Sequence, residues 1–504
     1  MKIKLSCIVL SAYMCLFIGL LHSQIATAQT PLTSTSANPI SSLLDAGTHQ
    51  VGFKLFHVYD KTRSFSPKYH YFGEKTHNPS GRPMQISMWY PAKAAANQTP
   101  LSYQDYVGYT VSEVNFNKTS TADQQQFVEQ IITSVNKPYQ QRLRQMYAQQ
   151  VNAYKDATMV TGDFPLVLYA PPLNTPSYDN FILCEYLASK GYIVLAVAAK
   201  GEYGRTQNPT VKEIHVQADD LAFLLQFGRA QSTSDQVGTI GFSVGGLSNL
   251  IFAAKNQDVD ATVSLDGSIM SLGWLADIKS SLYYDPPTFS SNLLMIGKNL
   301  KDPKLNPATF YDEVSYANKA LVRFDHAQHG YFSSDNLLTT LLFDDNMSEK
   351  DKQAGYQFYA QMSRYVGDFL DHFLKDGPKL TTRPQKAIAH SFSYQASNAN
   401  PIPPATISPL ILQYGFDYIE PIISDILRIQ PDYLTQLSWR DLHDTADQLA
   451  KNKQMTGAIK TLLLSARAFE GWYLTHVRLA QYYQRINDTP SAIKHYQLAL
   501  KDNP

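Results

Sequence analysis

The chain has 504 residues, which is enough for about two to four domains of ordinary size. Hydrophobic residues make up 44% of it and charged residues 17%, a globular composition that excludes a wholly disordered or collagen-like chain. The 43 basic residues match the 43 acidic ones, which excludes the strongly basic composition of a nucleic-acid binder. We therefore expect a multidomain globular protein that has no nucleic-acid partner.

Residues 1–28 have the pattern of a secretory signal peptide. Two lysines precede an apolar run at 5–21, and the small residues Ala26 and Ala28 flank one position before the expected cleavage site. The run is short for a membrane anchor, and no stop-transfer charge follows it. We expect a protein that is exported to the periplasm or secreted, with no stable membrane span after cleavage. Its mature form has a net charge of −2 and keeps one cysteine, Cys184, which excludes an intramolecular disulfide.

Periodicity and composition divide the rest of the chain into four regions. Short apolar runs alternate with helical stretches after residue 160, which predicts an α/β fold with a mostly parallel sheet and helices on both faces. Two alternating segments before them predict a hairpin whose second strand is stopped by Pro91. The expected regions are a linker at 29–50, an α/β domain at 51–378 with a helical insertion at 121–155, a Pro-rich linker and helical connector at 379–438, and an all-α helical-repeat region at 439–504.

The last region repeats with a period of 34 residues. Two helix-spaced sets carry the repeat: Ala446, Leu449, Ala458, Leu462 and Ser465, matched by Ala480, Tyr483, Ala492, Tyr496 and Ala499. This period, with small residues at helix crossings, is the tetratricopeptide signature. Two copies fall below the three that such repeats usually need for stability, so we expect 439–504 to dock on the rest of the chain or on a partner protein.

A serine lies in a glycine-rich turn between a predicted strand and a predicted helix. The sequence Gly-Phe-Ser-Val-Gly-Gly at 241–246 has the spacing of a nucleophile elbow. Gly241 and Gly245 omit the side chains that would clash in so tight a turn. Ser243 would present its hydroxyl at the edge of the sheet, with the Val244 amide directed at the same space.

A serine nucleophile needs a base, and the base needs an acid to orient it. After an elbow of this kind the acid precedes the histidine along the chain. His329, shortly after the last predicted strand, is the candidate base, and His326 is the alternative. Asp266 directly follows the strand after the elbow and is the candidate acid, while Asp302, after the next strand, is the alternative.

Two backbone donors are also required to stabilise an oxyanion. The Val244 amide is one candidate. The other should come from the loop that follows the apolar run at 166–169. Pro171 and Pro172 lack an N–H there, so Leu173 is the first residue that can donate.

These residues resemble the α/β-hydrolase superfamily, and within it the platelet-activating factor acetylhydrolase and dienelactone hydrolase group. The resemblance implies acyl transfer to water with Ser243, Asp266 and His329 as the triad. Dienelactone hydrolases use cysteine where this chain has Ser243, and most of these enzymes have His-Gly where it has Pro171-Pro172. The matching segments are QISMWYP at 85–91, FPLVLYAPPLN at 164–174, ASKGYIVLAVA at 188–198, GFSVGG at 241–246, SLDG at 264–267 and HGYF at 329–332.

Three functions follow as hypotheses. The first is an exported serine esterase acting on small-molecule or lipid-like esters, with the insertion at 121–155 as a candidate lid. The second is a catalytically weak or inactive scaffold that binds a protein through 439–504. The third is a peptidase or acyltransferase that uses the same triad. The Asp-His-x-x-His pattern at 325–329 lacks further zinc ligands, so we expect neither a metal nor another cofactor.

Overall fold

The computed structural model describes residues 40–67, 81–256, 258–281, 283–284, 286, 289–299, 309–315, 317–325, 327–375, 377, 389–396, 404–429 and 433–502. These residues form two compact units. The α/β unit comprises the chain up to 284 together with 291–311 and 319–395. The helical unit comprises 285–290, 312–318 and 396–504. The expected signal peptide lies outside the described residues.

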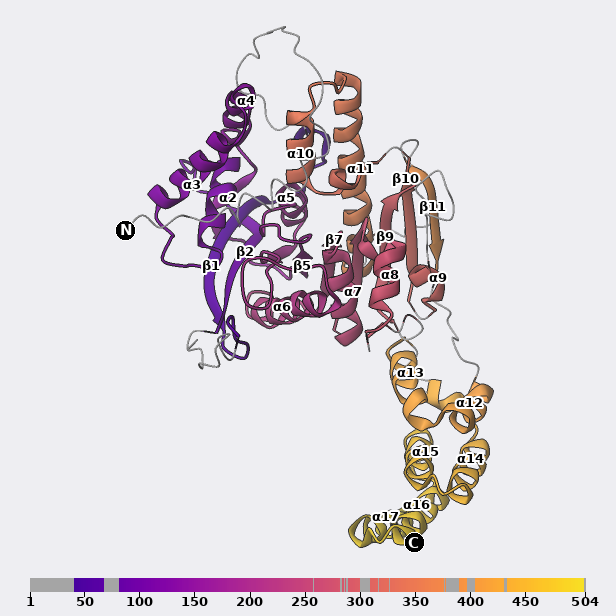
Figure 1. Ribbon diagram of the computed structural model, residues 1–504. Helices are drawn as coiled ribbons and strands as arrows, with labels where there is room; N and C mark the ends of the chain where they lie inside the picture. The colour runs from indigo at the N-terminus through magenta and orange to yellow at the C-terminus, as the bar shows by residue number, and fades with distance from the viewer. Residues whose placement is uncertain are drawn as a thin grey trace. The chain divides into compact units, whose positions relative to one another are not determined.

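One sheet of eleven strands forms the centre of the α/β unit (Figure 1). Its strand order is β11-β10-β9-β8-β7-β5-β6-β2-β1-β3, and β4 pairs with β2. The six strands from β10 to β6 are parallel. Strand β2 pairs antiparallel with β1, β4 and β6, and β11 pairs antiparallel with β10, whereas β3 pairs parallel with β1. The strands are β1 Gln50–Asp60, β2 Arg82–Lys93, β3 Ala153–Lys155, β4 Thr158–Met159, β5 Leu166–Ala170, β6 Ile193–Ala196, β7 Val237–Phe242, β8 Ala261–Leu265, β9 Asn292–Lys298, β10 Lys319–Phe324 and β11 Ala389–Gln395.

Helices cover both faces of this sheet. One face packs against α6 and α7, and the other packs against α5 and α11. The central strands are buried along their whole length because both of their faces are covered, which explains their unbroken apolar runs. The helices of this unit are η1 Ser41–Leu43, α2 Tyr103–Tyr109, η2 Thr110–Ser112, α3 Thr121–Ser134, α4 Lys137–Tyr147, α5 Phe181–Ser189, α6 Val211–Arg229, α7 Gly245–Lys255, η3 Ser268–Met270, α8 Leu272–Ile278, α9 Thr309–Glu313, η6 His329–Phe332, α10 Ser334–Phe343 and α11 Glu349–Leu374. The predicted fold class, a mostly parallel sheet between two helical layers, is confirmed.

The segment at 40–50, which is the described part of the expected linker, packs against α5. Ile40 is fully buried. The Gly47 amide donates to Ser189 Oγ at 2.9 Å, and the His49 amide donates to the Ser189 carbonyl at 3.1 Å. Polar composition concealed this packing because the contacts are made largely by the backbone. The remainder of the expected linker, 29–39, lies outside the described residues.

Two other expected boundaries are also corrected. Pro91 does not end the second strand: it pairs with Val51, and β2 continues to Lys93. The expected linker at 379–438 contains β11, which pairs with β10 and extends the sheet beyond residue 378. Both segments are held by neighbouring strands, which local composition does not reveal.

The predicted insertion at 121–155 is helical only as α3 and α4, and it ends in the edge strand β3. Its apolar side chains belong to the core of the α/β unit, including Val128, Ile132, Leu143 and Met146. They are therefore packing residues, as helical periodicity most often indicates. Tyr139 and Arg142 bind Asp345, just beyond α10.

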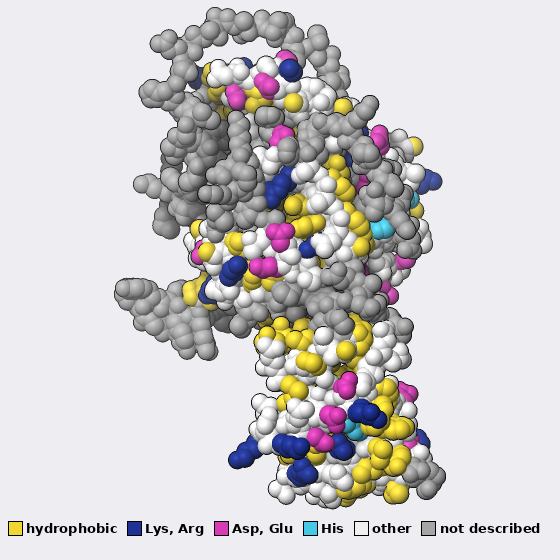
Figure 2. Space-filling model, turned by 90° about the vertical axis from the view of Figure 1, so that its right-hand side faces the viewer, with side chains coloured by type: hydrophobic (Ala, Val, Ile, Leu, Met, Phe, Trp, Pro, Cys, Tyr) yellow, Lys and Arg dark blue, Asp and Glu magenta, His cyan; other side chains and the backbone are white. Residues whose placement is uncertain are grey.

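The helical unit contains η8 Pro404–Thr406, α12 Ile407–Tyr414, α13 Phe416–Ile429, η9 Tyr433–Gln436, α14 Trp439–Lys451, α15 Met455–Ala468, α16 Tyr473–Arg485 and α17 Thr489–Asp502. Helices α14 and α15 begin 34 residues before α16 and α17. Hydrophobic side chains lie exposed on this unit (Figure 2), among them Trp472, Ile493 and Leu500. Within the part of the chain that the structure describes, no helix has the length and apolarity needed to span a bilayer.

Candidate active site

Ser243 occupies a strained turn between β7 and α7. Its φ angle is 55°, in the left-handed region that few non-glycine residues adopt. The turn leaves no room for side chains at its glycines. A Cβ on Gly241 would lie 2.2 Å from the Gly245 carbonyl oxygen, and one on Gly245 would lie 2.1 Å from the Ala170 carbonyl oxygen. The glycines of the elbow are therefore required by backbone packing on both sides of the serine.

His329 lies between Ser243 and Asp266. Its Nε2 is 2.9 Å from Ser243 Oγ, and its Nδ1 is 2.6 Å from Asp266 Oδ2. A neutral imidazole that donates from Nδ1 to the carboxylate can accept the serine proton at Nε2. The three side chains therefore form one continuous hydrogen-bonded series at the carboxyl edge of the sheet.

The acid is buried and the base is half exposed. The side chain of Asp266 is 7% exposed and that of His329 is 47% exposed. The Lys298 amide donates to Asp266 Oδ1 at 3.3 Å, and its ammonium lies 3.8 Å from Oδ2. The ring of Phe242 packs against the imidazole with centroids 5.0 Å apart. The Asp266 carboxylate is thus fixed by a backbone amide and a nearby charge, while the His329 side chain is half exposed to solvent.

Residues 171–180 connect β5 to α5 beside the elbow and are called the oxyanion loop here because Leu173 is the predicted second donor. Gln217 Nε2 donates to the Pro171 carbonyl at 2.7 Å. Asn174, with a φ of 63°, accepts from the Gln207 amide at 2.5 Å and donates to the Gln207 carbonyl at 3.0 Å. Neither the Leu173 amide nor the Val244 amide takes part in a hydrogen bond within the described ranges of the chain. Both predicted donors therefore have no hydrogen-bond acceptor among the described residues.

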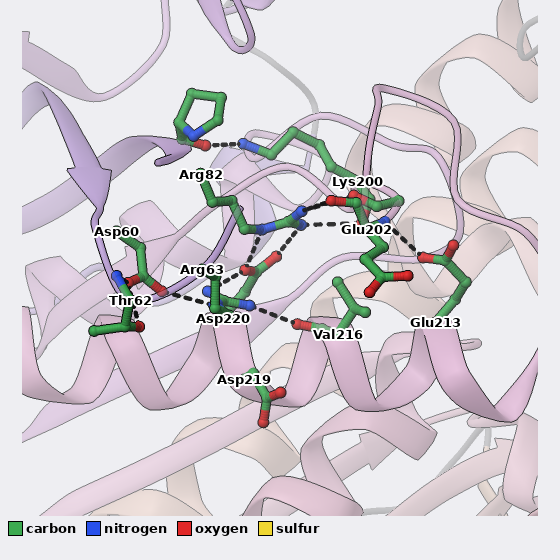
Figure 3. A network of polar contacts seen from close by, with 12 residues as sticks. Asp60, Thr62, Arg63, Arg82, Lys200, Glu202, Glu213, Val216, Asp219 and Asp220 are labelled. Carbon is green, nitrogen blue, oxygen red and sulfur yellow. Dashed lines mark hydrogen bonds and ion pairs between the residues drawn. The ribbon is translucent and has the colours of Figure 1, made fainter. Parts of the chain in front are cut away.

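A network of buried charges underlies the loop that follows β6 (Figure 3). Arg82 pairs with Asp220 at 2.7 Å and donates to the Lys200 carbonyl at 3.1 Å. Burial alone would raise the pKa of Asp220, but Arg82 and Arg63 hold it below its usual value. Burial lowers the pKa of Lys200 to about 7. This network anchors the same loop whose Gln207 backbone holds Asn174.

Sequence reasoning missed this network because its members are far apart in the chain. Arg63 follows β1 and Arg82 begins β2, while Lys200 lies in the loop after β6 and Asp220 belongs to α6. No spacing pattern links them. The one signal in the sequence is a single charged residue within an otherwise apolar or helical segment, which indicates a buried charge. This signal does not say which residue is its partner.

The structure brings some of the predicted site residues together, while others lie outside the described residues. Ser243, Asp266 and His329 meet, Val244 follows Ser243 in the elbow, and Leu173 belongs to the loop whose Pro171 carbonyl faces Gly245. The alternative acid Asp302 and the alternative base His326 lie outside the described residues. Asp325 accepts from Asn299 Nδ2 at 2.8 Å. Among the described side chains, no three histidine, cysteine or acidic groups gather as metal ligands.

A pocket of about 260 Å³ lies elsewhere in the α/β unit. It is lined by residues of 44–51, by Asn152 and Tyr154, and by residues of α5 that include Glu185. No residue of the Ser243 series or of the oxyanion loop contributes to it.

The sheet order, the elbow after β7 and the histidine after β10 define an α/β-hydrolase fold. No protein-family model matches the chain, and no curated protein matches it. Among solved structures it is similar to a ferulic acid esterase from Streptomyces cinnamoneus, with 19% sequence identity and a TM-score of 0.48. The match covers 70% of this chain and 98% of the esterase chain.

Proposed function

We propose that this protein is a serine hydrolase that cleaves carboxylic esters through an acyl-enzyme intermediate. The observation that carries the proposal is the hydrogen-bonded series from Ser243 through His329 to Asp266, with distances of 2.9 Å and 2.6 Å. A serine hydroxyl is a weak nucleophile unless an adjacent base takes its proton. A buried carboxylate behind the imidazole fixes its tautomer and stabilises its charged form.

The reaction follows from this geometry. Ser243 Oγ attacks the ester carbonyl carbon while His329 Nε2 takes the hydroxyl proton. The tetrahedral intermediate collapses when the imidazolium returns that proton to the departing alcohol. A water molecule then attacks the acyl-serine ester with His329 again as the base, and the carboxylic acid leaves.

The negative charge on the intermediate needs preorganised donors. We assign this role to the amides of Val244 and Leu173, because neither is bonded within the described ranges. Val244 follows Ser243 in the elbow, and Leu173 belongs to the loop whose Pro171 carbonyl faces Gly245. Pro171 and Pro172 occupy the positions where a His-Gly sequence would provide backbone donors, and neither proline has an N–H to donate. The hydrogen bonds of Pro171 with Gln217 and of Asn174 with Gln207 support a loop that is fixed before substrate binds.

We also propose export through the signal sequence at 1–28, on the pattern of its residues alone. For the helical unit we propose a tetratricopeptide-like pair that binds a protein segment. Two observations support this second role: the 34-residue offset between its helix pairs, and the exposed hydrophobic side chains Trp472, Ile493 and Leu500.

Hydrolysis of a series of esters and amides tests the proposal. The purified protein is assayed with p-nitrophenyl acetate, butyrate and octanoate and with a peptide p-nitroanilide, beside His329→Ala. We expect turnover of at least one ester, little turnover of the amide, and a loss of about 10⁴-fold or more in kcat for the variant. Faster cleavage of the amide, or equal activity of the variant, would reject the esterase assignment.

A further inference from the structure

The C-terminal end of the oxyanion loop is hydrogen-bonded to the C-terminal end of the turn that carries His329 and to the start of α10. This turn, the base turn, comprises η6 and Ser333, the N-cap of α10. Asn180 Nδ2 donates to the Phe332 carbonyl at 3.0 Å, and Asn180 Oδ1 accepts from the Ser334 amide at 3.1 Å. The Asp335 amide donates to the Asp179 carbonyl at 3.0 Å. The end of the oxyanion loop therefore both donates hydrogen bonds to the segment after His329 and accepts hydrogen bonds from it.

The carboxylate of Asp179 lies at the centre of this junction and is fully buried. Its Oδ1 accepts from Ser333 Oγ at 2.8 Å and from Asn336 Nδ2 at 3.3 Å. Its Oδ2 accepts from Tyr169 Oη at 2.7 Å. Because Tyr169 belongs to β5, the carboxylate links the sheet, the oxyanion loop and the base turn.

A second buried carboxylate lies beside it and makes different contacts. The side chain of Asp335 accepts a hydrogen bond from Tyr103 on α2. Burial, followed by repulsion from Asp335, raises the pKa of Asp179 to about 7, and burial raises the pKa of Asp335 to about 6. The other ionisable groups near Asp179 are Tyr169, Cys184 on α5 and Tyr359 on α11, and burial raises the pKa of each of them.

We propose that Asp179 is a positioning residue that holds the base turn against the oxyanion loop and keeps His329 aligned with Ser243. This inference rests on the proposed esterase function. Asp179 touches neither the substrate nor the reacting atoms. It acts through Ser333, four residues after His329, and through its own place in the loop that carries Leu173. A small displacement of either segment would misalign base, nucleophile and oxyanion donors together.

The kinetic test compares Asp179→Asn with the matched control Asp335→Asn in the full chain. Both changes replace a buried carboxyl group by an amide of the same size, but only the first puts an amide nitrogen where an oxygen accepts from Ser333 and Asn336 or from Tyr169. We expect Asp179→Asn to lower kcat for p-nitrophenyl acetate by about 10–100-fold with KM changed by less than about threefold. We expect Asp335→Asn to stay within about threefold of the wild type in both constants. Equal losses in the two variants, or an unchanged kcat for folded Asp179→Asn, would overturn the proposal.

A milder variant covers the case in which Asp179→Asn does not fold. Tyr169→Phe removes the donor to Asp179 Oδ2 and keeps the aromatic ring, which is buried in the core of the α/β unit. We expect it to retain the wild-type circular dichroism and to lose about three- to tenfold in kcat. A folded Tyr169→Phe with wild-type kcat would contradict the role of the junction.

A spectroscopic measurement separates this inference from the esterase assignment. The Nδ1 proton of His329, held by Asp266, is followed as a low-field proton resonance and needs no turnover. We expect it in the wild type and in Asp335→Asn, and we expect it shifted or broadened in Asp179→Asn. If the wild type cleaves no ester but the resonance still depends on Asp179, the esterase assignment fails and the positioning role stands. An unchanged resonance in Asp179→Asn would reject the positioning role.

Discussion

Ser243 and Asp266 occupy equivalent positions at the ends of neighbouring parallel strands, and both have positive φ angles, 55° and 36°. Their strands end in register, because Phe242 pairs with Leu265. The Ser243 amide donates to the Leu265 carbonyl at 3.1 Å. Two strained residues are thus fixed side by side by the sheet itself, and His329 contacts both of them from η6, which follows β10. Strain of this kind persists only where surrounding structure holds it, and it is concentrated at functional sites.

Replacing Gly245 tests the packing of the elbow against the oxyanion loop. In Gly245→Ala the new Cβ would lie 2.1 Å from the Ala170 carbonyl oxygen and 2.7 Å from that of Pro171, so the loop or the elbow must move. We expect kcat for p-nitrophenyl acetate to fall by about 100-fold or more. Gly273→Ala is the control, because a Cβ there meets nothing within 4 Å. Wild-type activity in Gly245→Ala would show that the close approach of loop and elbow is unnecessary.

Replacing the two candidate acids separately tests the assignment of Asp266. Asp266→Asn keeps the size of the side chain but removes the charge that faces His329 Nδ1 at 2.6 Å. We expect a loss of roughly 10⁴-fold in kcat at neutral pH, because the amide favours the wrong tautomer of the imidazole. Asp302→Asn should remain within about threefold of the wild type. A larger loss of kcat in Asp302→Asn than in Asp266→Asn would show that Asp302 is the acid that orients His329.

The buried carboxylates predict how stability depends on pH. The pKa of Asp179 is about 7 in the folded protein, against 3.8 for the ordinary group. The folded state therefore binds this proton more tightly between about pH 4 and pH 7, so its contribution to the free energy of unfolding falls as pH rises through that window. Asp179→Asn removes this titration. We expect the difference in urea midpoint, wild type minus variant, to decrease from pH 5 to pH 8, and an increase would contradict the buried, protonated state.

The sequence predicted the parts of the site that depend on local pattern. The elbow at 241–246 is a contiguous motif, and its glycines indicate positions where the tight turn has no room for a side chain. Asp266 and His329 follow apolar runs, and parallel strands bring their carboxyl ends to one edge. The order of the three residues along the chain was therefore enough to predict that their side chains lie together.

Other parts of the structure depend on contacts between distant segments. Asp179 is an ordinary polar residue in the sequence until Tyr169 and Ser333 are seen to bind it. The strand β11 lies in a Pro-rich region and is defined by its pairing with β10. The packing of 40–50 rests on backbone bonds to Ser189. None of these features has a periodicity or a motif that would reveal it.

The most direct test of the account is covalent labelling of the nucleophile. The purified protein and Ser243→Ala are treated with a fluorophosphonate, and their intact masses are measured. We expect a single adduct on the wild type and none on the variant, because only a serine activated by His329 reacts rapidly with such a reagent. A folded wild type that remains unlabelled, or equal labelling of Ser243→Ala, would contradict the assignment of Ser243 as the activated nucleophile.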